Sequence, residues 1–171
     1  MWNEPSAGVA VAALDPDRAS RQPAPAVVAS VEPGSIGEDL GFEPGDQLLS
    51  INGVRPRDLI DYRYLIVEEE LHLEIRDAAG VLHQVDLEKD EDDGLGLAFT
   101  EALFDGLRQC SNACAFCFID QQPPGHRSSL YLKDDDYRLS FLYGSYLTLT
   151  NLSDADWQRI EQQRLSPLFV S

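Results

Sequence analysis

The sequence is poor in basic residues and has no long apolar segment. Its 171 residues include 13 Lys and Arg against 30 Asp and Glu, which gives a formal net charge of -17. A charge of this sign and size repels polyanions and argues against a nucleic-acid-binding surface. No apolar run approaches the roughly 20 residues that a membrane-spanning helix requires. Residues 1–5 (MWNEP) also lack the basic and apolar regions of a secretory signal, so we expect a cytoplasmic protein without a membrane segment.

Cysteine is equally scarce. Cys110, Cys114 and Cys117 are the three cysteines of the chain, and they lie within eight positions. Three thiols cannot all pair, and a disulfide across two or three intervening residues is rarely free of strain. Thiolate ligation of a metal tolerates such spacings. The cluster therefore predicts a metal centre, and free thiols agree with the reducing conditions of the cytoplasm.

Two kinds of metal centre remain open. A zinc ion could be held in a tetrahedral Cys₃His shell completed by His126, although structural zinc sites usually combine two short ligand pairs separated by a longer loop. The spacing favours the alternative, an iron-sulfur cluster with one iron free of protein ligands. The Cys-x3-Cys-x2-Cys pattern, with Phe116 immediately before the last cysteine, resembles the signature of the radical S-adenosylmethionine (SAM) enzymes.

This resemblance implies a specific chemistry. In that family the three thiolates bind three irons of a [4Fe-4S] cluster, and the amino and carboxylate groups of SAM chelate the fourth iron. An electron from an external donor then cleaves SAM to a 5′-deoxyadenosyl radical, which abstracts hydrogen from a substrate. The hard chemistry belongs to cluster and cofactor, while the protein orients and shields them. The sequence does not indicate which substrate is used.

The N-terminal half has the pattern of a small α+β domain. Residues 1–26 are rich in Ala, Pro, Ser and Asp without a period and predict a disordered tail. Strands are expected at 27–31, 47–51, 71–75 and 81–87, with a short helix through Ile36 and Leu40 and an Asn52-Gly53 hairpin turn. Asp58 predicts the start of an amphipathic helix, because its side chain can cap the first turn.

Two segments of this half, 31–36 (VEPGSI) and 41–53 (GFEPGDQLLSING), resemble the bacterial PDZ domain. The resemblance implies a fold that binds peptide or protein C-termini by adding a strand to a sheet edge, with backbone amides capturing the carboxylate. The nearest match to the carboxylate-binding loop is Gly94-Leu95-Gly96-Leu97, which follows the predicted strands instead of preceding residue 27. Because of this position, a scaffold or lid role is as well supported by the sequence as peptide binding.

The C-terminal half predicts a different architecture. A short strand or turn at 103–107, the cysteine loop, a strand at 146–150, a helix beginning at Ser153 and a strand at 168–170 would be the start of a β/α barrel. On this helix Trp157 is expected in the core. We therefore divide the chain into a tail (1–26), a PDZ-like domain (27–90) and the first part of a radical SAM barrel (91–171).

A complete barrel would need on the order of another hundred residues. We expect the chain to be a fragment of a longer enzyme, and an isolated fragment is not expected to complete its active site. The fold class is thus an α+β PDZ-like domain followed by an incomplete α/β domain.

Further segments carry a closer resemblance. The chain is similar to a bacterial family of PDZ-plus-radical-SAM proteins described as iron-sulfur oxidoreductases. The matching segments are 103–106 (LFDG), 117–121 (CFIDQ), 134–144 (DDDYRLSFLYG) and 147–152 (LTLTNL). Cys110, Cys114 and Cys117 alone match the wider superfamily's cluster motif residue by residue. The Gly-Gly-Glu that usually holds the methionine amino group of SAM is missing.

Other residues occupy that place. Thr150 and Asn151 are predicted to contact SAM, with capping of the next helix as an equal alternative. For Asp134–Asp136 and Arg138 an exposed acidic turn is the favoured interpretation, and a contact with substrate or cofactor is the alternative. Three functions stay open for the chain: a radical SAM enzyme, a PDZ-type peptide-binding module and a structural zinc protein.

Overall fold

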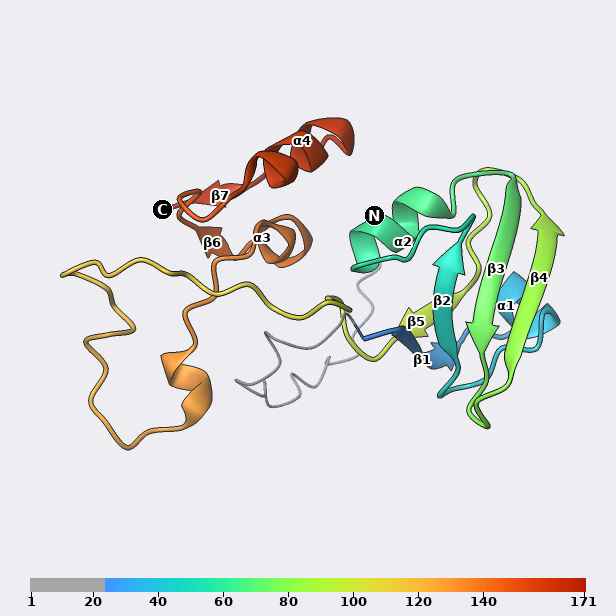
Figure 1. Ribbon diagram of the computed structural model, residues 1–171, viewed down its shortest axis with the longest axis horizontal. Helices are drawn as coiled ribbons and strands as arrows, with labels where there is room; N and C mark the ends of the chain where they lie inside the picture. The colour runs from blue at the N-terminus through green and yellow to red at the C-terminus, as the bar shows by residue number, and fades with distance from the viewer. Residues whose placement is uncertain (1–23) are drawn as a thin grey trace.

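The computed structural model describes residues 24–171, which form a five-stranded antiparallel sheet followed by a smaller α/β unit (Figure 1). The sheet has the order β4-β3-β2-β1-β5. Most of the tail expected at 1–26 lies outside the described residues, and Ala26 already belongs to β1. The elements of this half are β1 (Ala26–Val31), α1 (Ile36–Asp39), β2 (Gln47–Ile51), α2 (Leu59–Leu65), β3 (Glu70–Arg76), β4 (Leu82–Glu88) and β5 (Leu97–Phe99).

The sheet forms because apolar residues alternate along its strands. In β3, Leu71, Leu73 and Ile75 are buried while the residues between them face outward. Alternation of this kind buries one face of an antiparallel sheet and leaves the other to solvent. Each fully buried Leu or Ile contributes roughly 1.5–3 kcal/mol to stability. The same core receives Phe42, Leu48, Ile51, Tyr62, Leu95 and Phe104.

Two local predictions for this half are confirmed. Asn52 and Gly53 have positive φ values of 50° and 75°, and the backbones of Ile51 and Val54 exchange two hydrogen bonds of 2.9 Å across them. This geometry is the tight hairpin turn that the Asn-Gly pair favours. The side chain of Asp58 accepts hydrogen bonds from the first turn of α2, as expected of a helix cap.

The edge strand β5 lies beyond residue 90, where we expected the first domain to end. It pairs antiparallel with β1, and Val31 lies opposite Leu97. The segment Gly94-Leu95-Gly96-Leu97 therefore leads directly into the edge of the sheet. Its place after the other strands in sequence does not separate it from them in space.

The second half is built around one parallel β-α-β unit. Strands β6 (Tyr146–Leu147) and β7 (Phe169–Val170) pair in parallel, and α4 (Asp154–Gln162) connects them. A crossover helix is the usual way to join neighbouring parallel strands. The described residues form this unit and not a barrel. The segment 103–107, expected as a strand or turn before the cysteines, contains a turn at 104–105, and Leu103 makes a single bridge to Asp58.

Helices complete this half. Ser153 and Asp156 form the capping box at the start of α4 that the sequence suggests. Ile160 and Leu165 are buried with Leu147 and Tyr137, whereas Trp157 is 41% exposed, so its expected place in the core is wrong. The helix α3 (Tyr137–Tyr143) and the short 3₁₀ helix η2 (Ser128–Tyr131) were not predicted. Within residues 24–171 no helix is both long and apolar enough to cross a membrane.

Candidate metal centre

The cysteines lie on a long excursion of the chain between β5 and α3, which projects away from the rest of the molecule in Figure 1. Its two ends are held together at the base. The backbone N–H of Cys110 donates to the carbonyl of Lys133 at 2.7 Å, and Gln109 bridges to Asp134. The first cysteine is thus fixed to the returning chain, while Cys114 and Cys117 lie farther along the excursion.

All three thiols are free and half-buried. The N–H of Cys117 donates to the carbonyl of Cys114 at 3.1 Å, which closes a turn between these two residues. In the part of the chain that the structure describes, no three Cys, His, Asp or Glu side chains converge closely enough to hold a metal. The excursion is therefore not assembled around a common point, either for the three thiols alone or for a shell that includes His126.

A cation lies close to the thiols. Lys133 forms an ion pair with Asp120, with Nζ and Oδ2 2.6 Å apart, and this hydrogen bond raises the pKa of Lys133 and lowers that of Asp120. Negative charge on Cys117 or Cys110 would raise the pKa of Lys133 further. Lys133 is thus a positive charge close enough to Cys110 and Cys117 to interact with them electrostatically.

The end of β6 meets the cysteine excursion. Nδ2 of Asn112 donates to Oγ1 of Thr150 at 2.6 Å, and Oδ1 of Asn151 accepts from the backbone N–H and the Oγ of Ser111 at 3.2 and 2.6 Å. Nδ2 of Asn151 lies 3.4 Å from Sγ of Cys110. The structure thus brings two residues predicted to contact SAM next to the first cysteine.

Residues 115–119 (AFCFI) surround Cys117 with apolar side chains and predict an apolar shell around the thiols, but the aromatic residues among them do not form one. Phe116 is 82% exposed and Phe118 is 77% exposed. Neither ring covers the thiols in this structure. The sequence suggested a shell because apolar residues surround the cysteines, but a loop without its own core has nothing to pack them against.

The acidic segment before α3 is also not the exposed turn we favoured. Asp134 is exposed, but Asp135, Asp136 and Arg138 are 4%, 3% and 0% exposed. Asp135 accepts hydrogen bonds from the backbone N–H and Oγ1 of Thr148 at 2.7 and 2.8 Å, and from the side-chain amide of Asn151. Its role was missed because the partners follow it in sequence by more than ten residues.

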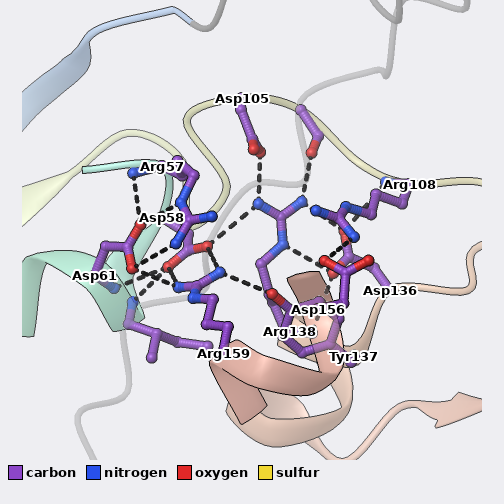
Figure 2. A network of polar contacts seen from close by, with 12 residues as sticks. Arg57, Asp58, Asp61, Asp105, Arg108, Asp136, Tyr137, Arg138, Asp156 and Arg159 are labelled. Carbon is purple, nitrogen blue, oxygen red and sulfur yellow. Dashed lines mark hydrogen bonds and ion pairs between the residues drawn. The ribbon is translucent and has the colours of Figure 1, made fainter. Parts of the chain in front are cut away.

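Arg138 and Arg159 join the two halves of the molecule through a buried ionic network (Figure 2). Arg138 binds Asp105 at 2.5 Å and Asp58 at 3.2 Å with Nη1, and Asp136 at 2.7 Å with Nη2. Arg159 binds both oxygens of Asp58, at 2.7 and 2.8 Å. We call these five residues the junction.

The junction is fully paired. Burial alone would lower the pKa of Arg138, but hydrogen bonds and charge from Asp136 and Asp105 outweigh it and raise the pKa. Among residues 24–171 every buried side-chain nitrogen or oxygen has a hydrogen-bond partner. A buried charge network of this kind is costly to break, because removing one partner leaves the others uncompensated. The junction therefore fixes α3 and α4 against the start of α2.

Two family models match these two halves. The model of the Radical SAM-like domain matches residues 89–171, and that of the PDZ domain matches residues 27–77. The chain joins a PDZ domain to a radical SAM-like domain. No curated protein gives a significant match to the chain. The junction thus lies between these domains: Asp58 belongs to the PDZ domain, and its arginine partners belong to the radical SAM-like domain.

The donor set of the radical SAM-like domain fits an iron-sulfur cluster in its chemistry. Three free thiols on one loop supply three sulfur ligands, which is one fewer than the four irons of a [4Fe-4S] cluster. With three thiols as protein ligands, the fourth iron of such a cluster would need a ligand from outside this set. A zinc shell would need a fourth protein ligand, for which the sequence offers His126.

Proposed function

We propose that the chain is a radical SAM iron-sulfur protein in which Cys110, Cys114 and Cys117 hold a [4Fe-4S] cluster. The observation that carries this proposal is the set of three free thiols on one excursion of a segment that matches the Radical SAM-like domain. Cluster and SAM together, when bound, supply a hydrogen-abstracting radical once an external donor provides an electron. Free thiols suit the reducing conditions of a cytoplasmic location, which we include in the proposal.

The residues of the chain have distinct proposed roles. The three thiolates are proposed to bind iron, and Lys133 is proposed to offset negative charge at Cys110 and Cys117. Thr150 and Asn151, in the turn after β6, are proposed to lie beside SAM, supported by their contacts to Asn112 and Ser111 next to the first cysteine. The exposed Phe116 is available to cover the cluster and exclude water from it.

The test is anaerobic reconstitution of the full chain with iron and sulfide, followed by absorption spectroscopy. We expect a brown protein with broad visible absorption and about four irons per chain, as a [4Fe-4S] cluster requires. Cys114→Ala should lose this absorption, whereas His126→Ala should retain it. A colourless wild-type protein that binds one zinc ion, and loses it in His126→Ala, would support the structural zinc alternative and contradict the cluster.

Peptide binding by the PDZ domain is a second proposed function, supported by the place of β5. Gly94-Leu95-Gly96-Leu97 leads into this strand, and among the described strands β5 pairs with β1 alone, which leaves its other edge open. An open edge of this kind can accept an added peptide strand. The helix α2 lies beside β5. The ring of Tyr62 in α2 contacts the ring of Phe99 in β5 edge to face, with centroids 4.8 Å apart.

Part of the space between β5 and α2 is filled by the chain itself. Phe104 packs against Phe99 with ring centroids 5.2 Å apart, and the N–H of Leu59 donates to the carbonyl of Ala102 at 2.9 Å. The chain thus occupies the space beside β5 at the start of α2, so we expect the open edge of β5 to accept only the last few residues of a partner. Display of random peptides against the full chain tests this: enrichment of free C-termini supports binding, and no enrichment contradicts it.

A further inference from the structure

We infer that Asp135 is a positioning residue of the proposed metal centre. Its buried carboxylate fixes the side chain of Asn151, and Asn151 in turn fixes the loop at Cys110 and Ser111. This positioning of Asn151 and of the loop involves residues of the chain alone and needs no metal. Its consequence for a cluster rests on the proposed function.

The surroundings of Asp135 are unusual for a buried carboxylate. It is 4% exposed, and its hydrogen-bond donors are the backbone N–H and hydroxyl of Thr148 and the amide of Asn151, all of them neutral. Among the described residues no Lys or Arg forms an ion pair with it, whereas the adjacent Asp136 is paired with Arg138. Burying a carboxylate without a cation is costly. The cost is offset by the three hydrogen bonds that hold the end of β6.

These hydrogen bonds allow only one orientation of the Asn151 amide. An ionised carboxylate can only accept hydrogen bonds, so Nδ2 of Asn151 must face Asp135. Oδ1 then faces the other way and accepts both donors of Ser111, the backbone N–H and the hydroxyl. A rotated amide would place Oδ1 against the carboxylate and Nδ2 against the N–H of Ser111, which is unfavourable at both ends.

The same orientation of the Asn151 amide provides a hydrogen-bond donor to the sulfur of Cys110. Nδ2 of Asn151 donates to Sγ of Cys110 at 3.4 Å while it is held by Asp135. Hydrogen bonds to sulfur ligands stabilise the more negative, reduced state of an iron-sulfur cluster and raise its reduction potential. Asp135 therefore acts on the first cysteine through Asn151, without touching the metal ligands itself.

Hydrogen exchange of the Ser111 amide in the metal-free full chain tests the geometric step. In Asp135→Asn the new amide can turn a donor towards Asn151, so Asn151 is expected to rotate and release Ser111. The Ser111 N–H should then exchange about tenfold faster or more. The N–H of Cys117, which donates to the backbone carbonyl of Cys114, is the internal reference for this rate. Asn151→Ala should give a similar acceleration. The matched control is Asp134→Asn, the same substitution at the exposed neighbouring position, which should change nothing.

A reciprocal exchange of the two side chains provides the sharper test. In the double variant Asp135→Asn with Asn151→Asp, the new carboxylate at 151 accepts from Ser111 and from the new amide at 135. Protection of the Ser111 N–H should therefore return to within about twofold of wild type. Thermal unfolding of each variant verifies that it is folded. The inference is overturned if Asp135→Asn leaves Ser111 exchange unchanged, or if the double variant is unfolded or leaves Ser111 unprotected.

A cluster-loaded sample gives an independent measurement. Potentiometric titration should show a lower reduction potential in the double variant than in wild type, because a carboxylate has replaced the N–H donor beside Cys110. Asp134→Asn should match wild type. Failure of wild type to load a cluster would count against the proposed function alone, since the exchange experiment decides the positioning role without metal.

Discussion

Asp58 caps α2 and binds Arg159 of α4 with the same carboxylate. Its Oδ1 accepts from the backbone N–H groups of Ile60 and Asp61 at 3.0 and 2.9 Å, and from Nη2 of Arg159 at 2.7 Å. The side chain is fully buried. The residue that begins a helix of the PDZ domain is thus also the anchor of the radical SAM-like domain, which couples the local stability of one domain to the other.

Asp58→Ser separates these two roles. Serine can still cap the helix, so the first turn of α2 should persist. Arg138 and Arg159 would lose a shared carboxylate while remaining buried, and loss of one partner in such a network costs roughly 3–5 kcal/mol. Urea denaturation should show a decrease of this size in the free energy of unfolding. Asp154→Ser, at an exposed position on α4, is the control and should cost less than about 1 kcal/mol. An equally small loss in Asp58→Ser would contradict the anchoring role.

Stability should fall in acid, because several carboxylates at and beside the junction have lowered pKa values. Burial alone would raise these pKa values, but hydrogen bonds from neighbouring arginines outweigh it. The carboxylates are Asp61, Asp136 and Asp156. An unfolded Asp has a pKa near 3.8, so these groups contribute their full stabilisation above that pH and lose it as the pH falls through the lower folded values.

Urea denaturation at about pH 7, 5 and 3 measures this effect. From these three carboxylates we expect little change between the first two pH values and a clear loss at the third. Asp156→Asn removes one of the three, so the loss on going from pH 5 to pH 3 should be smaller than in wild type. Stability that is unchanged or higher at pH 3 would show that these ion pairs do not contribute.

Two features require glycine at position 96: its backbone conformation and the close approach of Ser35. Its φ is +69°, and a Cβ placed on it would lie 2.3 Å from Cβ of Ser35 at the start of α1. Gly34 has a similar φ of +75° but open space around it. Gly34→Ala should therefore cost only the conformational term of about 1–2 kcal/mol, and Gly96→Ala clearly more. If thermal unfolding showed equal losses of stability in Gly34→Ala and Gly96→Ala, the start of α1 would have to move away from position 96 at no cost in free energy.

Local signals in the sequence predicted the first half well. The Asn52-Gly53 turn, the Asp58 cap and the alternation in β3 each depend on neighbouring residues, and the structure confirms all three. Gly94-Leu95-Gly96-Leu97 was judged by its position in sequence, and this was misleading. Antiparallel pairing of β5 with β1 brings it to the sheet edge from about 66 residues away, a relation that no local pattern reports.

Long-range charge pairing explains the main error. We predicted an exposed turn at Asp136 and Arg138 because charged residues are seldom buried without partners, and the sequence did not reveal their partners. Here Arg138 finds Asp58 80 positions earlier, and Asp58 also binds Arg159, 101 positions later in the chain. The cysteine cluster was visible in the sequence because its three members lie within eight positions of one another. Asp135 was not, because its importance depends on the end of β6.

Acid-labile sulfide in protein purified without oxygen is the most direct measure of the central claim. If Cys110, Cys114 and Cys117 hold a [4Fe-4S] cluster, the full chain should contain about four sulfides and about four irons, and Cys110→Ala should contain far less of both. Wild-type protein that is free of inorganic sulfide after this preparation and after reconstitution would contradict the account.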